Sequence, residues 1–356
     1  MVNENISRIG SLNLLRTFAL FLVILDHASS WENFFQISDL KIYYFIQSIA
    51  KMGVPLFLTI SGYLLLDPKV ESIKTFLIKR ARRILPPFIA WSYIYIYMQK
   101  VCPLEDWQRA FPTETRFGLL NILISPAYGH LWYIYLLIGL YLAVPFLWKI
   151  NRNLTNEETI YLLIIIIIKI IAAFLQGVLG RTIVNSSTLV TMFCDYIIFF
   201  EGGYLLRKYE PNIHKHRTMC WVVLCGSILL NWATICFFSP DIVDKTVFLG
   251  GNSPLMITAT FGLWGGVVGR DISNIIIKKI CDKIAVLSFQ AYFVHMIFLW
   301  VCTRVSVDGV TLFDVKPIWV ATIAVACFVY ALSLLTSYSI DQTMGIMGKA
   351  LHRRTK

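Results

Sequence analysis

The sequence predicts an all-α, polytopic membrane helix bundle with about ten transmembrane helices and both termini in the cytoplasm. Three observations lead to this fold class: 57% of the residues are hydrophobic, only 15% are charged, and the mean hydropathy is +0.66. Soluble domains are nearer half apolar and a quarter charged, so soluble and disordered classes fit poorly. Because one crossing takes ~20 apolar residues, we expect residues 1–356 to form a single transmembrane domain without an appended soluble domain.

The predicted helices are the apolar runs between charged segments or Pro- and Gly-containing segments. The first follows the polar stretch MVNENISRIG, the third begins near Pro86 after a basic cluster, and the fifth contains an isoleucine run at 164–168. The eighth and tenth begin at Pro254 and Pro317, and basic segments precede the seventh and ninth. In order, we expect helices at 11–30, 46–66, 84–99, 131–148, 159–177, 189–206, 219–239, 254–269, 284–303 and 317–340.

Lysine and arginine are distributed unevenly between the two sides of the predicted membrane. The N-terminus and every second loop hold 21 of them, the opposite loops hold 8, and acidic residues divide evenly. Cytoplasmic loops carry such an excess, so both termini are expected inside and the number of crossings is expected to be even. The net charge of +11 therefore reflects topology, and we expect membrane lipid rather than nucleic acid as a partner.

The eight cysteines form no Cys-x-x-Cys pair, and most fall inside apolar runs. They are typical of small core residues. We expect neither a metal site nor an obligatory disulfide.

The first predicted helix carries two ionisable residues at membrane depth, Arg16 and His27. Eleven residues return to nearly the same helix face and advance roughly 16 Å along the axis. One face therefore offers a fixed cation and, beyond it, a base that titrates near neutral pH. The alternative is that Arg16 extends to the cytoplasmic headgroups and His27 lies in the opposite interface. Asp26 points about 100° away from His27, so it is at most an orienting partner.

An ordered set of motifs runs from the first to the ninth predicted helix, and together they resemble the acyltransferase-3 family of integral membrane O-acyltransferases. The motifs are Arg16-x10-His27, the run Gly53-Val54-Pro55-Leu56-Phe57-Leu58-Thr59-Ile60-Ser61-Gly62-Tyr63, the basic Arg80-Ala81-Arg82-Arg83 with Pro86-Pro87, His130-Leu131-Trp132-Tyr133, Glu201-Gly202-Gly203, and Ser288 to His295. The resemblance implies transfer of an acetyl group from acetyl-CoA to a hydroxyl of a surface polysaccharide or its lipid-linked precursor. It also implies a multi-pass protein of the bacterial inner membrane.

The resemblance assigns the catalytic and donor-binding roles. His27 would act as general base or carry the acyl group, and Arg16 would stabilise the oxyanion or hold the thioester. Glu201 is the candidate counter-ion of Arg16, or else faces cytoplasmic water. The phosphates of acetyl-CoA need cations, which Lys79, Arg80, Arg82 and Arg83 supply; the alternative is that this cluster only anchors the topology. Ser61 is a further cofactor-binding candidate, although a helix-packing hydroxyl is the favoured alternative, because no neighbouring base is suggested.

Four residues are candidates for binding the acceptor sugar. His130 and Trp132 lie at the external mouth of the fourth helix, where Trp132 also suits an aromatic belt. Tyr292 and His295 lie on the ninth helix, with His295 expected near mid-bilayer; its alternative role is a hydrogen bond in the core. The sugar and the oligomeric state, including a homo-oligomer, stay open.

The competing hypothesis is a transporter or flippase for a lipid-linked saccharide or small solute. Transporters with inverted repeats show matching interrupted helices in their two halves. Arg16-x10-His27 has no counterpart in residues 180–356, which favours the enzyme.

Overall fold

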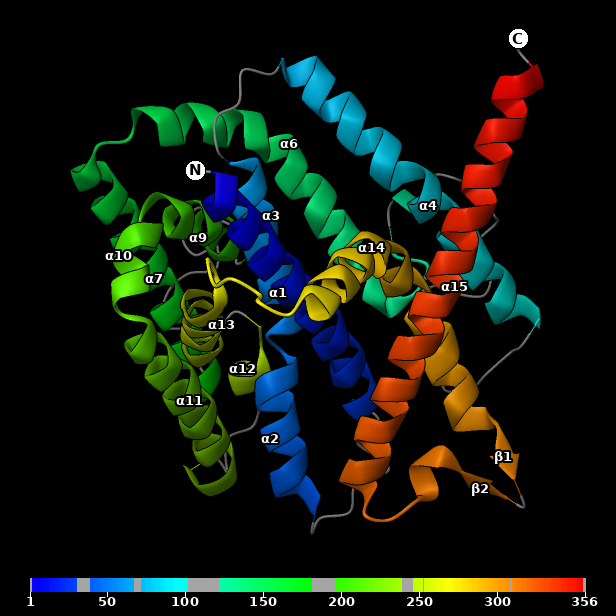
Figure 1. Cartoon of the computed structure of the whole chain (residues 1–356). Helices are drawn as coiled ribbons and strands as arrows, with labels where there is room; N and C mark the ends of the chain where they lie inside the picture. Colours follow the sequence, from blue (N-terminus) through cyan, green and yellow to red (C-terminus); the bar gives the residue numbers. More distant parts are fainter. Residues whose placement is uncertain are drawn as a thin grey trace. The chain divides into compact units, whose positions relative to one another are not determined.

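A computed structural model describes residues 2–30, 39–66, 72–101, 122–123, 125–180, 196–238, 246–251, 253–307 and 309–354. These residues are predominantly helical (Figure 1). The longer helices are α1 (Val2–Ser29), α2 (Leu40–Ala50), α3 (Gly53–Leu65), α4 (Ile73–Val101), α6 (Trp132–Asn153), α7 (Asn156–Leu179), α9 (Ile197–Lys208), α11 (Arg217–Ala233), α13 (Pro254–Val267), α14 (Ile275–Arg304) and α15 (Ile318–Arg354). The short elements are η3 (Gly129–Leu131), α10 (Glu210–Lys215), η4 (Thr234–Phe238), α12 (Thr246–Leu249), β1 (Ser306–Val307), β2 (Val310–Thr311) and η5 (Leu312–Asp314).

The chain divides into two compact units, Met1–Leu66 with Leu154–Lys356, and Asp67–Asn153. In the first unit α1 contacts α2, α3, α14 and α15 (Figure 1). Helix α1 is therefore the element around which this unit packs. In the second unit α4 contacts α6. The expectation of a single transmembrane domain stays a prediction.

Each of the ten predicted helices overlaps a helix of the structure. Within the described ranges, seven helical segments are long and apolar enough to cross a membrane. Helix α13 is not among them because its 14 residues span only about 21 Å at 1.5 Å per residue. The predicted start of the sixth helix, 189–195, lies outside the described residues. The chain is thus a helical membrane bundle, while ten crossings and cytoplasmic termini stay predictions.

The second predicted helix differs most from the structure. Instead of one helix over 46–66, the chain forms α2 and α3 with a break at Lys51 and Met52. Pro55 accounts for the break, because its ring blocks the helical path before it and it lacks an N–H, which is tolerated in the first turn of a new helix. The interruption places Lys51 at a helix junction rather than within a continuous helix.

Helices α3 and α9 cross closely, through Gly62 and Gly203. A Cβ on Gly62 would overlap the backbone carbonyl of Phe200, and one on Gly203 would overlap that of Thr59. Small residues let two membrane helices approach at backbone distance. Glycine at positions 62 and 203 therefore lets the backbones of α3 and α9 approach this closely.

Candidate functional site

Arg16 and His27 both lie on α1, which is unbroken from Val2 to Ser29. Both side chains are partly buried. Because no kink separates them, the eleven-residue spacing places them on one face, roughly 16 Å apart along the axis. The shared face predicted from the sequence is confirmed, whereas their catalytic roles stay predictions.

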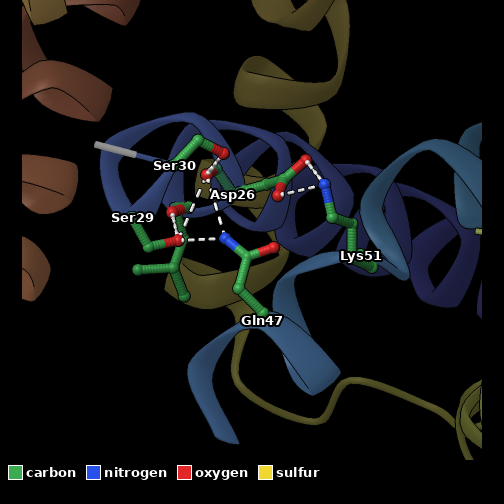
Figure 2. Close-up of polar contacts among 6 residues, drawn as sticks. Asp26, Ser29, Ser30, Gln47 and Lys51 are labelled. Carbon is green, nitrogen blue, oxygen red and sulfur yellow. Dashed lines mark hydrogen bonds and ion pairs between the residues drawn. The ribbon is translucent and has the colours of Figure 1, made fainter. Parts of the chain in front are cut away.

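The C-terminal end of α1 carries an ion pair (Figure 2). The ammonium of Lys51 lies 2.9 Å from Oδ1 and 3.2 Å from Oδ2 of Asp26. Lys51 is 29% exposed and Asp26 18% exposed, so both charges are largely withdrawn from solvent. Asp26 therefore joins α1 to the junction between α2 and α3.

Hydrogen bonds next to this ion pair fix the same end of α1 against α2 (Figure 2). The Gln47 amide donates to Ser29 Oγ over 2.6 Å and to the Asp26 carbonyl over 3.3 Å. Ser29 Oγ in turn donates to the Leu25 carbonyl over 2.7 Å. On the next residue of α2, Ser48 Oγ accepts from the Asn231 amide of α11 over 3.0 Å. The backbone that carries His27 is thus held by polar contacts as well as by packing.

His27 meets His295 of α14. The ring centroids lie 5.2 Å apart with an interplanar angle of 30°, and His295 is fully buried. Nδ1 of His295 lies 2.6 Å from the Tyr292 carbonyl, and the Tyr292 ring packs 5.7 Å from the His295 ring. The two histidines therefore lie at one level of the bundle. The depth of His295 in the membrane and its role toward the acceptor stay predictions.

The two remaining sequence candidates of this unit take different positions. Ser61 donates to the Phe57 carbonyl of its own helix over 2.9 Å, which supports the packing alternative. Glu201 lies partly buried on α9. Its pairing with Arg16 stays a prediction.

A polar network that the sequence did not reveal joins α3, α9 and α10. Buried Glu210 accepts a 2.6 Å hydrogen bond from the Tyr63 hydroxyl and lies 3.5 Å from Nε2 of His214. The Arg207 guanidinium donates to the Tyr63 carbonyl over 3.1 Å and lies over the Tyr63 ring. This network ties the ends of three helices together beside the close α3–α9 crossing.

The basic cluster of the second unit lies on α4. The Arg80 guanidinium lies over two aromatic rings, 5.3 Å from the centroid of Phe76 and 5.8 Å from that of Tyr141. Its Nε is buried and donates to no acceptor within the described part of the chain. Lys79, Arg82 and Arg83 are exposed. The structure therefore separates one arginine that lies over two aromatic rings from three exposed cations.

His130 is almost fully buried in the second unit, 3% exposed. Tyr95 and Tyr128 stack at 5.1 Å, and the imidazole packs edge-on against both rings. Trp132 opens α6, is 38% exposed and touches Tyr133. Of this pair, Trp132 presents the accessible aromatic surface, whereas His130 is enclosed.

Within the described ranges, no group of three or more His, Cys, Asp or Glu side chains is arranged to hold a metal. Lys169 is buried on α7. Asp195, the acidic residue of the next predicted helix, lies outside the described residues.

Sequence reasoning missed Lys51, and it missed the aromatic residues around Arg80 and His130. A usable signal existed for Lys51, since it and Asp26 are opposite charges within neighbouring predicted helices, and such charges tend to pair. Phe76 and Tyr141 gave no signal, because aromatic residues are common throughout this chain.

Comparison with known proteins completes the description of the site. A family model described as "Acyltransferase domain" matches residues 9–341. The probable poly-beta-1,6-N-acetyl-D-glucosamine export protein of Staphylococcus aureus strain MRSA252 is 22% identical over 271 residues, 73% of each chain. The proteins of the same name from strains Mu50 and MSSA476 are 22% and 21% identical over the same length. No solved structure matches significantly.

Proposed function

The chain belongs to the acyltransferase-3 family, and we propose that it is an O-acetyltransferase that moves acetyl from cytoplasmic acetyl-CoA to a hydroxyl of a surface polysaccharide or its lipid-linked precursor. We place it in the bacterial inner membrane. The observation that carries the proposal is the pairing of His27 with His295 on a helix end fixed by Asp26 and Lys51. Such a rigid pair of imidazoles at membrane depth suits proton transfer or acyl transfer.

Two routes lead to the same products. As general base, His27 takes the proton of the sugar hydroxyl while its oxygen bonds to the thioester carbon; the carbon–sulfur bond breaks, and the thiolate takes the proton. As acyl carrier, His27 attacks the thioester carbon and releases the thiol, and the hydroxyl then displaces the imidazole. On either route Arg16 stabilises the negative charge of the carbonyl oxygen. Glu201 is proposed as its counter-ion.

The donor-binding proposal rests on Arg80. Phosphates are recognised by guanidinium N–H groups, and an arginine stacked between rings is already oriented for that task. Lys79, Arg82 and Arg83 add positive charge nearby along α4. For the acceptor, the exposed ring of Trp132 is proposed to stack on a sugar, with His130 and the aromatic residues around it supporting that surface.

Replacing Arg80 by alanine is expected to weaken acetyl-CoA binding by about 10- to 100-fold, the value of hydrogen bonds to charged groups. Arg80→Lys should recover only part of the loss, because lysine lacks the planar fork. The measurement is equilibrium binding of acetyl-CoA to detergent-purified protein of normal size-exclusion profile. Arg82→Ala is the matched control, since that side chain is exposed on the same helix. Unchanged binding in both variants would leave the cluster as a topological anchor, and equal losses would contradict the special role of Arg80.

The function itself is tested by expressing the chain in a bacterium that lacks glycan acetylation and analysing its surface polysaccharide and lipid-linked precursors by mass spectrometry. Acetyl increments on sugars, removed by mild base, are expected. If the host makes a range of surface glycans and all of them stay unacetylated although the protein is inserted in the membrane, the proposal is contradicted.

Export of a polysaccharide is the second candidate function. It is favoured by the names of the relatives, which are export proteins, and by the interrupted α2–α3 pair, since broken helices also occur in transporters. Its test is polysaccharide release from spheroplasts with the protein, without it, and with His27→Ala. Export predicts that release depends on the protein and persists in His27→Ala. Acetyl transfer predicts that release does not depend on the protein and that acetylation is lost in His27→Ala.

A further inference from the structure

Two arginines meet at the corner where α11 begins and α13 ends. Arg217 is the first residue of α11, is half-buried, and donates to the Gly266 carbonyl over 3.4 Å. Gly266 is the last residue but one of α13. Arg270 follows α13, is exposed, and lies over the Trp221 ring, 5.8 Å from its centroid. Because Trp221 lies about one turn after Arg217 on α11, both guanidinium groups lie at this corner.

Close helix packing fixes the shape of the corner. Helices α11 and α13 pack against each other (Figure 1). A Cβ on Gly266 would lie 2.7 Å from the Trp221 ring, and one on Gly265 would lie 2.6 Å from Sγ of Cys220. Both distances are shorter than van der Waals contact, so α13 approaches this side of α11 because it carries glycines there. The ring over which Arg270 lies is therefore held in place by the helix contact.

The corner carries an excess of positive charge. The guanidinium groups of Arg217 and Arg270 repel each other, while Glu210 attracts that of Arg217. Glu210 is already engaged by the Tyr63 hydroxyl at 2.6 Å and by Nε2 of His214 at 3.5 Å. Within the described ranges, neither arginine forms an ion pair with a carboxylate. An anion between the two guanidinium groups would relieve their repulsion and accept charge-assisted hydrogen bonds from both.

A stripe of side chains continues from this corner along α11. Its members recur at every fourth position and are Arg217, Trp221, Cys225 and Leu229. Cys225 is exposed and Leu229 is 52% exposed. At 1.5 Å per residue the stripe is roughly 18 Å long, and it lies on a segment that is long and apolar enough to cross a membrane. A cation, then an aromatic ring, then apolar side chains match the order of headgroup, interface and acyl chains in a lipid leaflet.

From this arrangement we infer that Arg217 and Arg270 bind the phosphate of an anionic membrane lipid, whose acyl chains lie along the apolar stripe of α11. Guanidinium groups suit phosphate because their N–H groups form paired hydrogen bonds with it. Basic sites between membrane helices on the cytoplasmic side bind such headgroups, and the distribution of lysine and arginine predicts that this end of α11 is cytoplasmic. The apolar stripe favours a lipid over a soluble phosphate, because a nucleotide has no chains to place on it.

The test is binding of phosphatidylglycerol to detergent-purified protein, measured by native mass spectrometry. The wild type is expected to bind this lipid more tightly than phosphatidylcholine. Arg270→Gln should weaken phosphatidylglycerol binding by about tenfold, the effect of a lost hydrogen bond to a charged group, and Arg270→Lys should recover part of the loss. Lys279→Gln is the matched control, because it removes the same charge from an exposed position on the neighbouring α14. Equal losses in Arg270→Gln and Lys279→Gln, or no preference for phosphatidylglycerol, would overturn the inference.

A second measurement separates binding from folding. Arg270 is exposed, and its guanidinium donates to no acceptor within the described residues. Arg270→Gln should therefore unfold at the wild-type temperature in phosphatidylcholine nanodiscs and at a lower temperature than the wild type in phosphatidylglycerol nanodiscs. Coenzyme A in solution distinguishes the two sources of phosphate, because it should leave the bound lipid in place. If coenzyme A displaces the lipid, the corner binds a nucleotide phosphate and the assignment to lipid is overturned. These measurements require no catalysis, so their outcome is independent of acetyl transfer.

Discussion

Replacing His27 by alanine is expected to lower acetyl transfer by about 10²- to 10⁴-fold, the usual contribution of a general base. The loss is greater still if His27 carries the acyl group, because the covalent route then disappears altogether. The physical reason is that α1 places an imidazole beside that of His295, with ring centroids 5.2 Å apart, so a base is held at a fixed position. The measurement is release of CoA and labelling of the glycan acceptor with radioactive acetyl-CoA.

Labelling of the wild-type protein without acceptor separates the two routes. An acyl-histidine forms without acceptor, so a wild-type protein pulsed with labelled acetyl-CoA alone should retain hydroxylamine-labile label if His27 is the carrier, and none if it is only the base. His216→Ala is the matched control, because His216 is exposed between α10 and α11. Full activity in His27→Ala would contradict both routes.

The second large effect is expected at the ion pair of Figure 2. Lys51→Met or Asp26→Asn leaves the opposite charge without its partner at membrane depth. We expect a loss of roughly 1–3 kcal/mol in the free energy of unfolding, below the cost in a fully buried pair because both side chains keep some exposure. Transfer activity should fall with it, since the end of α1 that carries His27 loses its hold on the α2–α3 junction.

A double-mutant cycle isolates the interaction. The double variant Asp26→Asn, Lys51→Met should lose less stability than the two single variants together, because it removes both charges. Thermal unfolding in detergent at neutral pH is the measurement. Lys41→Met is the matched control at the other end of α2, where the ammonium lies over the Phe237 ring. Purely additive losses would mean that the pair contributes nothing.

The sequence predicted the helices well because burial in lipid selects long apolar runs. Such runs can be recognised without knowing which helices pack against one another. It also identified the family, through motifs whose residues are adjacent along the chain. It did not predict the break at Lys51 and Met52. There a single proline outweighs an apolar run that otherwise continues from 46 to 66.

The candidate site was predicted in part. Arg16 and His27 could be placed on one face because helix periodicity fixes that relation. Asp26 is adjacent to His27 in the sequence and was therefore the candidate orienting group. In the structure its carboxylate forms an ion pair with Lys51. Arg80 could not be distinguished from Arg82 by sequence, since only the rings of Phe76 and Tyr141 make one of them different.

By itself, then, the sequence determined a helical membrane protein of the acyltransferase-3 family, with a cation and a base along one face of its first helix. Tertiary structure alone decided that His27 meets His295, that Asp26 meets Lys51, and that α3 and α9 touch through glycines. The reason is the range of the interactions. Periodicity and hydropathy act between residues a few positions apart, whereas contacts between helices depend on rotation and height, which the packing of the whole unit fixes.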